Sequence, residues 1–117
     1  YARAVELDPG HAAARLDLGR LLHEAGHPRE AAEQYRRALE ARPGEPTAVT
    51  ATFNLGVALE DLGHVAEAIV AYERAVELDP DLADAHYNLS RLFERTGRRD
   101  AAFRHLKAYR QLTLPPR

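Results

Sequence analysis

One short stretch of the 117-residue sequence has the residue types and spacing of a metal-dependent hydrolase. Residues 23–27 are His-Glu-Ala-Gly-His, which matches the H-E-x-x-H pattern in which two histidines bind zinc and the glutamate acts as general base. This chemistry needs both imidazoles on one face of a continuous helix, with the glutamate beside the metal-bound water. Whether the motif can bind zinc and act in hydrolysis therefore depends on whether a continuous helix runs through it.

The residues around the motif argue against a continuous helix. Gly26 is the residue type at which helices end, because glycine accepts left-handed backbone angles. Pro28 biases His27 toward extended angles. Two later stretches, 60–64 and 94–98, carry the same glycine without the histidine pair. We interpret the motif as a turn between two helices, and a zinc protease is only a remote alternative.

The remaining groups that could do chemistry are spread along the chain without a shared spacing. The sequence has no cysteine and no glycine-rich phosphate loop, and its carboxylates alternate with arginines on polar helix faces. The other histidines lack the spacing of metal ligands: His11, His64, His86 and His105. We therefore expect no catalytic residue, no metal site and no cofactor.

A repeat of small residues, tyrosines and prolines organises the sequence instead. In the first unit, Leu18 and Gly19 are followed by Gly26, Ala31, Tyr35, Ala38 and Pro43. In the second unit, the same types recur as Leu55, Gly56, Gly63, Ala68, Tyr72, Ala75 and Pro80. The third unit is weaker, with Leu89, Ser90, Gly97, Ala102 and Leu106. A period of this length indicates stacked helical units.

Each unit has the apolar spacing of two helices, with the second glycine ending the first helix. Gly19 and Gly56 lie inside that first helix, where glycine costs about 0.5–1 kcal/mol relative to alanine. We expect the partner helix to approach closely at these points, with Ala31 and Ala68 on the facing side.

These motifs resemble the tetratricopeptide repeat, whose period is about 34 residues. Arg15, Thr52 and His86 depart from that family, since they stand where a tryptophan or another large residue is common. The resemblance implies an all-α fold, a right-handed superhelical solenoid of antiparallel helix pairs. We expect a single domain over residues 1–117, divided into the tail of a preceding repeat (1–11), repeats at 12–45, 49–82 and 83–116, and an insertion at 46–48. Because the chain starts at Tyr1 inside a helical pattern, we interpret it as part of a longer protein.

The insertion breaks the register between the first two units. Gly19 and Gly56 are three residues further apart than Gly56 and Ser90, and three residues are close to one helical turn. Two outcomes fit: an extra first turn on the helix leading to Asp61, with Pro46 in that turn, or a looser loop.

In proteins similar to this one, the first helix of each pair lines a concave binding surface. The resemblance places nine residues there: Leu16, Asp17, Arg20, Phe53, Asn54, Val57, Tyr87, Asn88 and Arg91. Phe53 and Tyr87 would be apolar anchors, Asn54 and Asn88 would bind a peptide main chain, and Arg20 and Arg91 would bind a carboxylate.

The C-terminal unit differs in charge and in shape. Residues 1–90 hold eight arginines against sixteen Asp and Glu, whereas residues 91–117 hold eight Arg and Lys against two. The last helix presents a possible self-association face, formed by Phe103, Leu106, Tyr109 and Leu112, unless the tail from Leu114 covers it. The acidic remainder makes nucleic acid an unlikely partner.

We therefore expect a non-catalytic protein–protein interaction scaffold that binds a peptide or partner segment in its concave groove. The alternative is an oligomerisation or regulatory module of a larger protein, such as a transcriptional regulator or a transferase. The sequence contains no membrane-length apolar run and no visible signal segment, so we expect no membrane association and a cytoplasmic location.

Overall fold

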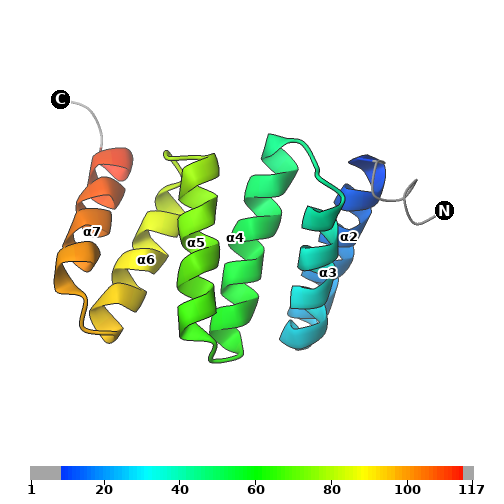
Figure 1. Ribbon diagram of the computed structural model, residues 1–117, viewed down its shortest axis with the longest axis horizontal. Coiled ribbons are helices and arrows are strands. Elements are labelled where there is room, and N and C mark those ends of the chain that lie inside the picture. Colours follow the sequence, from blue (N-terminus) through cyan, green and yellow to red (C-terminus); the bar gives the residue numbers. More distant parts are fainter. Residues whose placement is uncertain (1–8, 115–117) are drawn as a thin grey trace.

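The computed structural model describes residues 9–114, with side chains from His11 onward, and these residues form six helices without a strand (Figure 1). Expectations for residues 1–8 and 115–117 lie outside this range. The helices are α2 (Pro9–Glu24), α3 (Pro28–Glu40), α4 (Glu45–Asp61), α5 (Val65–Leu78), α6 (Ala83–Arg95) and α7 (Arg99–Thr113).

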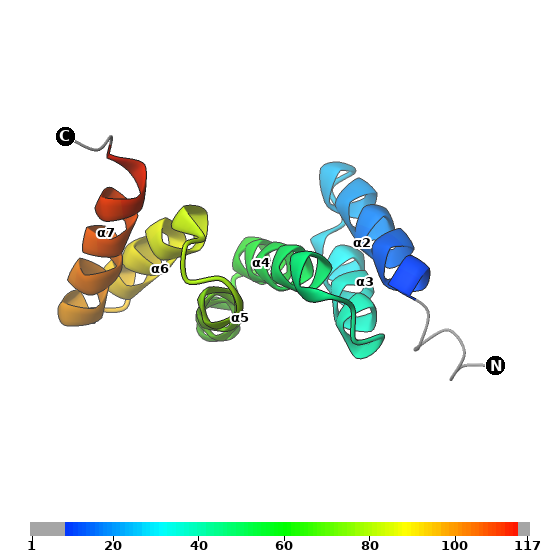
Figure 2. The same cartoon turned by 90° about the horizontal axis from the view of Figure 1, so that it is seen from above.

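Neighbouring helices pack as three antiparallel pairs, α2 with α3, α4 with α5 and α6 with α7. Seen from above, the pairs follow one another along an elongated body of 49 × 32 × 22 Å (Figure 2). This arrangement confirms the predicted all-α solenoid of helix pairs. None of the described helices is both long enough and apolar enough to cross a bilayer.

The turn inside each pair has the geometry that its glycine predicts. Gly26, Gly63 and Gly97 adopt φ angles of 87°, 81° and 81°. In the first pair, the amide of His27 donates to the carbonyl of Leu22 at 2.8 Å, which closes the end of α2. His23 and His27 therefore belong to different elements, and the helix that zinc hydrolysis requires ends at Glu24.

The three surplus residues form an extra helical turn. Helix α4 begins at Glu45 with Gly44 as its N-cap and Pro46 in its first turn, where the missing N–H of proline costs nothing. The equivalent helix α6 begins only at Ala83, which aligns with Val49. Of the two outcomes that the sequence allowed, the structure has the extra turn.

The mid-helix glycines accommodate a tyrosine ring from the partner helix. A Cβ atom added to Gly19 would lie 2.5 Å from Cε1 of Tyr35, and one added to Gly56 would lie 2.6 Å from Cε1 of Tyr72. Both rings are fully buried. The expected close approach therefore exists, and a ring fills it. In the third pair Leu106 takes the place of the tyrosine, which leaves room for the side chain of Ser90.

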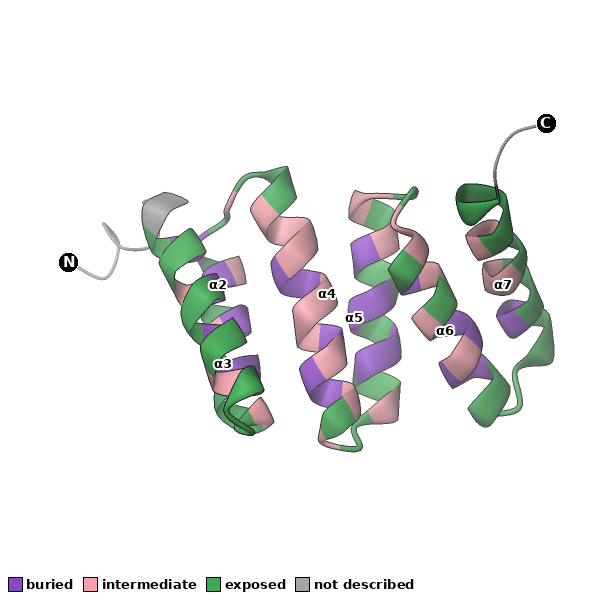
Figure 3. Ribbon diagram, turned by 180° about the vertical axis from the view of Figure 1, so that it is seen from behind, coloured by how far each residue is buried: buried purple, intermediate pink, exposed green. Residues whose placement is uncertain are grey.

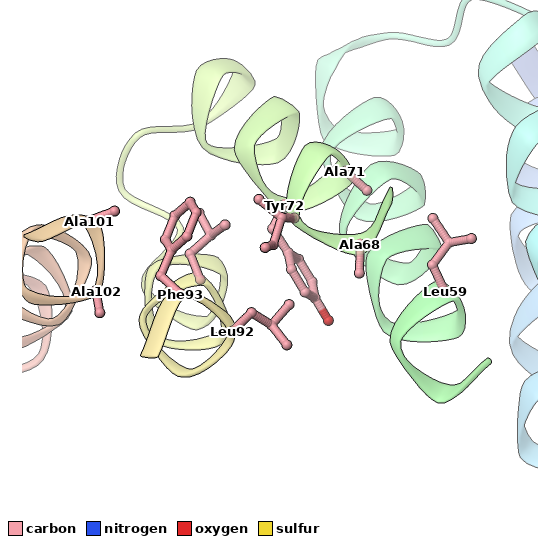
Figure 4. Packing of buried hydrophobic residues seen from close by; sticks show 10 residues of the cluster. Leu59, Ala68, Ala71, Tyr72, Leu92, Phe93, Ala101 and Ala102 are labelled. Atoms are coloured by element: carbon pink, nitrogen blue, oxygen red, sulfur yellow. The ribbon is translucent and has the colours of Figure 1, made fainter. Parts of the chain in front are cut away.

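The second and third pairs share one apolar core. Tyr72 lies between α5 and α6, with Leu92 and Phe93 on the α6 side (Figure 4). Helix α7 contributes only Ala101 and Ala102 to this core and is otherwise mostly exposed (Figure 3).

Two histidines link α6 to α7. His86 Nε2 lies 2.9 Å from the carbonyl oxygen of Pro80, which can only accept, so this nitrogen carries the proton of the neutral ring. His86 Nδ1 then accepts from Nδ1 of His105 at 3.0 Å. Burial, together with His86 and Arg104, lowers the pKa of His105 below its ordinary value of 6.5. The structure thus favours the neutral form of His105.

We expect Gly56→Ser to lower the free energy of unfolding by about 1–3 kcal/mol, because its Cβ would overlap the Tyr72 ring. In a Tyr72→Leu background the same change should cost at least about 1 kcal/mol less, since Ser90 and Leu106 already coexist in the third pair. Urea denaturation of the four proteins of this double-mutant cycle measures the coupling. Additive costs would show that the ring does not set the requirement for glycine.

We expect the protein to lose stability as the pH falls below about 6.5, because the folded state holds His105 neutral while the unfolded state accepts the proton. The contribution is fully present above the unfolded pKa and is lost as the pH falls through the lowered folded pKa. Thermal unfolding at about pH 7.5 and about pH 5 measures the change. The control His86→Thr with His105→Ala, which copies Thr52 and Ala71 of the second pair, should show a smaller drop in Tm. An equal drop would contradict this account.

Candidate protein-binding surface

A hollow of about 530 Å³ lies between α2 and α4 on the side where the sequence placed a binding surface. It brings together three of the predicted residues, Arg20, Asn54 and Val57. The other lining residues are His23, Glu24 and Tyr35. The sequence analysis did not select Glu24 and Tyr35 for the surface, since Tyr35 also fits the core pattern.

The tyrosine hydroxyl contributes a neutral polar group to this hollow. Burial raises the pKa of Tyr35, an effect that Arg20 opposes and Glu24 reinforces. The hydroxyl therefore stays protonated near neutral pH and can donate or accept a hydrogen bond. Arg20 itself is half exposed and has only a loose ion pair with Asp17, at 3.8 Å.

An imidazole–carboxylate contact joins the first two pairs at the end of this hollow. His23 Nε2 lies 2.5 Å from Oδ2 of Asp61, across 38 residues of sequence. The contact connects the last turn of α2 to the last residue of α4. The imidazole of the H-E-x-x-H stretch therefore has a structural contact of its own.

Arg91 forks onto a carboxylate, as predicted, but the carboxylate belongs to the same chain. Its two terminal nitrogens donate to Glu60 at 2.7 and 3.0 Å, and one also donates to Oδ1 of Asn88 at 3.3 Å. The hydroxyl of Tyr72 donates to Glu60 at 3.1 Å. The hydrogen bonds from Arg91 hold the pKa of Glu60 below its usual range, against the opposing effect of burial. Arg91 therefore connects the second and third pairs, and Asn88 of the same helix supports it, so both side chains already have partners within the chain.

Two apolar residues assigned to the surface pack inward. Leu16 is only 7% exposed and lies in the core with Ala31 and Tyr35, so its assignment as a lining residue is wrong. Phe53 is half-buried, with its ring 5.5 Å from that of Tyr72. Its remaining surface is too small for a freestanding anchor. Sequence pattern alone does not separate these positions from exposed ones, because both lie on the first helix of a pair.

The aromatic residue of the third pair remains accessible. Tyr87 is 44% exposed, and its ring packs 5.1 Å from that of Tyr109. Tyr109 was assigned to the self-association face, where it is half-buried, as is Leu106. Phe103 and Leu112 of that face are 66% and 39% exposed. The predicted face is therefore only partly open.

Within residues 9–114, no three His, Asp or Glu side chains come together as metal ligands. The polar groups of the concave side are instead spaced along several helices.

Comparison with known proteins agrees with the geometry. A family model described as tetratricopeptide repeat matches residues 1–46, 16–83 and 53–113. The chain belongs to the tetratricopeptide repeat family. A comparison with curated protein sequences gives no match.

Solved structures of tetratricopeptide repeat proteins superpose on nearly the whole chain. The crystal structure of MamA is 25% identical with a TM-score of 0.81, over 94% of this chain and 63% of that one. A point mutant of MamA is 26% identical with a TM-score of 0.81, over 97% of this chain and 81% of that one. The Hsp90 co-chaperone Cns1 from Saccharomyces cerevisiae is 18% identical with a TM-score of 0.85, over 94% of this chain and 36% of that one, and shows the fold alone. The chain thus spans less than two thirds of the first MamA structure and of Cns1.

Proposed function

We propose that this tetratricopeptide repeat chain is a non-catalytic scaffold that binds a segment of a partner protein on its concave side. The observation that carries the proposal is the hollow between α2 and α4, which Arg20, Asn54 and Tyr35 line. Within the described residues, the side chain of Asn54 has no hydrogen-bond partner and Arg20 has only its loose pair with Asp17. These groups are available to a ligand at no cost to the fold.

The ligand chemistry follows from the available groups. An asparagine amide both donates and accepts, which matches the paired N–H and C=O of a peptide main chain. A half-exposed arginine beside it suits a carboxylate of the same ligand. Val57 supplies an apolar contact in the same hollow. A peptide segment with an acidic side chain satisfies all three.

We expect Arg20→Ala combined with Asn54→Ala to lower capture of the partner by about tenfold or more, because interface truncations of this kind cost roughly 1–2 kcal/mol in total. The measurement is quantitative mass spectrometry of proteins retained from lysate by immobilised wild-type and variant chains. The control is Arg37→Ala, since Arg37 is an exposed arginine of α3 that pairs with Glu33. Proteins that the wild type and the control retain equally, and the double variant loses, define the concave partner. Retention of every captured protein by the double variant would place the ligand elsewhere.

A second candidate function is oligomerisation through the C-terminal end. Phe103 is the most exposed large apolar side chain of α7, and it borders a hollow of about 580 Å³ together with Leu106 and Ala102. Arg95 and Arg99 flank this hollow. The basic end could pair with the acidic remainder of a second copy.

We expect Phe103→Ser to shift the protein toward the monomer if this end mediates self-association, because it removes the largest exposed apolar contact. Light scattering over a range of protein concentrations measures the state. Val70→Ser is a matched control, since Val70 is equally exposed at 65% on a different face. A wild type that stays monomeric at all concentrations would exclude this function.

A further inference from the structure

A larger hollow, about 690 Å³, lies over helix α4 between α3 and α5. Figure 2 shows α3 and α5 flanking α4, so that α4 is the floor of this groove and the other two helices are its walls. Both α3 and α4 line this groove and the concave hollow, but they contribute different residues to each. The apolar lining comprises Leu39, Ala48, Leu55, Leu59, Val70 and Leu78.

The groove exists because three of the side chains that line it are smaller than those at the equivalent positions of the next helix pair. Thr52, Leu59 and Ala71 line it. When the repeats are aligned with Gly56 opposite Ser90, Thr52 corresponds to His86. In the same alignment Leu59 corresponds to Phe93 and Ala71 to His105. At that next junction the larger rings meet, with His86 and His105 3.0 Å apart and the Phe93 and His105 rings stacked at 5.7 Å. Side chains therefore fill this space where the third pair follows the second, and they leave it open where the second pair follows the first.

The floor of the groove has the spacing that helices use to pack against helices. Ala48, Thr52, Leu55 and Leu59 follow one another at intervals of four, three and four residues, which is a heptad-type stripe. On α5 the lining positions 67, 71, 74 and 78 have the same intervals. At 1.5 Å per residue, the α4 stripe is about 16 Å long. The extra turn of α4 extends it, since Glu45 and Ala48 both lie in that turn.

The rim of the groove is rich in arginine although this part of the chain is acidic. Arg36, Arg42 and Arg74 line it against Glu45 and Glu67. The pair between Arg36 and Glu67, at 3.6 Å, has both side chains about half exposed, so it is weak and a ligand carboxylate can replace Glu67.

Arg42 is the free cation of this rim. It has no acidic partner among the described residues. It also adopts a φ of 50°, which only a minority of non-glycine residues do. An apolar stripe with helical intervals, bordered by an unpaired arginine, complements an apolar ridge that carries acidic side chains.

We propose that this groove binds an amphipathic α-helix of a partner protein, with glutamate or aspartate residues beside its apolar ridge. The helix lies along α4 between α3 and α5, its apolar side chains on Leu39, Leu55 and Val70. Its carboxylates pair with Arg42 and, in place of Glu67, with Arg36. The site is separate from the concave surface, so that one chain can hold two partners.

The test uses two labelled helical peptides of sixteen residues. Both carry leucine at intervals of four, three and four, and one has glutamate on the flanking positions where the other has lysine. Fluorescence anisotropy measures binding, and amide chemical shifts of the protein map the site. We expect saturable binding of the glutamate peptide, with shifts at Leu39, Leu55 and Val70, and at least about tenfold weaker binding of the lysine peptide.

Two variants test the location. Val70→Asp changes a side chain that is 65% exposed, so it should leave the fold intact, and it should weaken the glutamate peptide by about tenfold or more because it removes an apolar contact and repels the carboxylates. Thr52→His, Leu59→Phe and Ala71→His together copy the filled junction of the third pair and should abolish binding, with circular dichroism to check folding. Arg20→Ala with Asn54→Ala should bind the peptide as the wild type does.

Several results would overturn the proposal. They are the absence of saturable binding, equal binding of both peptides, or unchanged binding by Val70→Asp. Dodecanoate serves as a third probe. Saturable binding of dodecanoate without binding of the glutamate peptide would assign the groove to a small anionic amphiphile instead.

Discussion

The contact on which the rest of this structure depends is the packing of a tyrosine ring onto a glycine inside the neighbouring helix. Tyr35 over Gly19 and Tyr72 over Gly56 leave no room for a Cβ atom, and both rings are fully buried. The ring fixes how closely the two helices of a pair approach, and it also sets where its hydroxyl emerges. Tyr72 thereby reaches Glu60, which in turn holds Arg91 of the next pair. Packing within one pair and polar contact between pairs thus depend on the same side chain.

Each junction between pairs uses a different polar link, even though the backbone positions are equivalent. Between the second and third pairs, Arg91 and Glu60 form a charge-assisted fork. The equivalent positions one pair earlier hold Val57 and His23, which cannot form that fork, and His23 bonds Asp61 instead. The first junction therefore leaves Arg20 and Asn54 uncommitted beside it. The difference explains why the accessible polar groups gather between α2 and α4.

The local features of the fold could be predicted from the sequence because they depend on single residues. Gly26 and its counterparts end helices through their own backbone freedom, and the repeat spacing places the helices. The pairing of Arg91 could not be predicted, because its partner Glu60 lies 31 residues away and their contact depends on how the third helix pair packs against the second. The burial of Leu16 could not be predicted for a similar reason, because it depends on packing against α3. Pro46 suits either the first turn of a helix or a loop, so the extra turn needed coordinates to decide it.

Residues that depart from the repeat consensus determine most of the surface that a partner could recognise. Consensus positions such as Gly56, Ala68 and Tyr72 are buried, so they offer no surface by which a partner could recognise one pair rather than another. The departures create the differences: Thr52 and Ala71 open a groove at a place that His86 and His105 close. The second pair, with the small side chains, and the third pair, with the rings, both pack as antiparallel helices, so this exchange leaves the pair architecture intact. Selection can therefore change the surface of one junction without changing the solenoid that presents it.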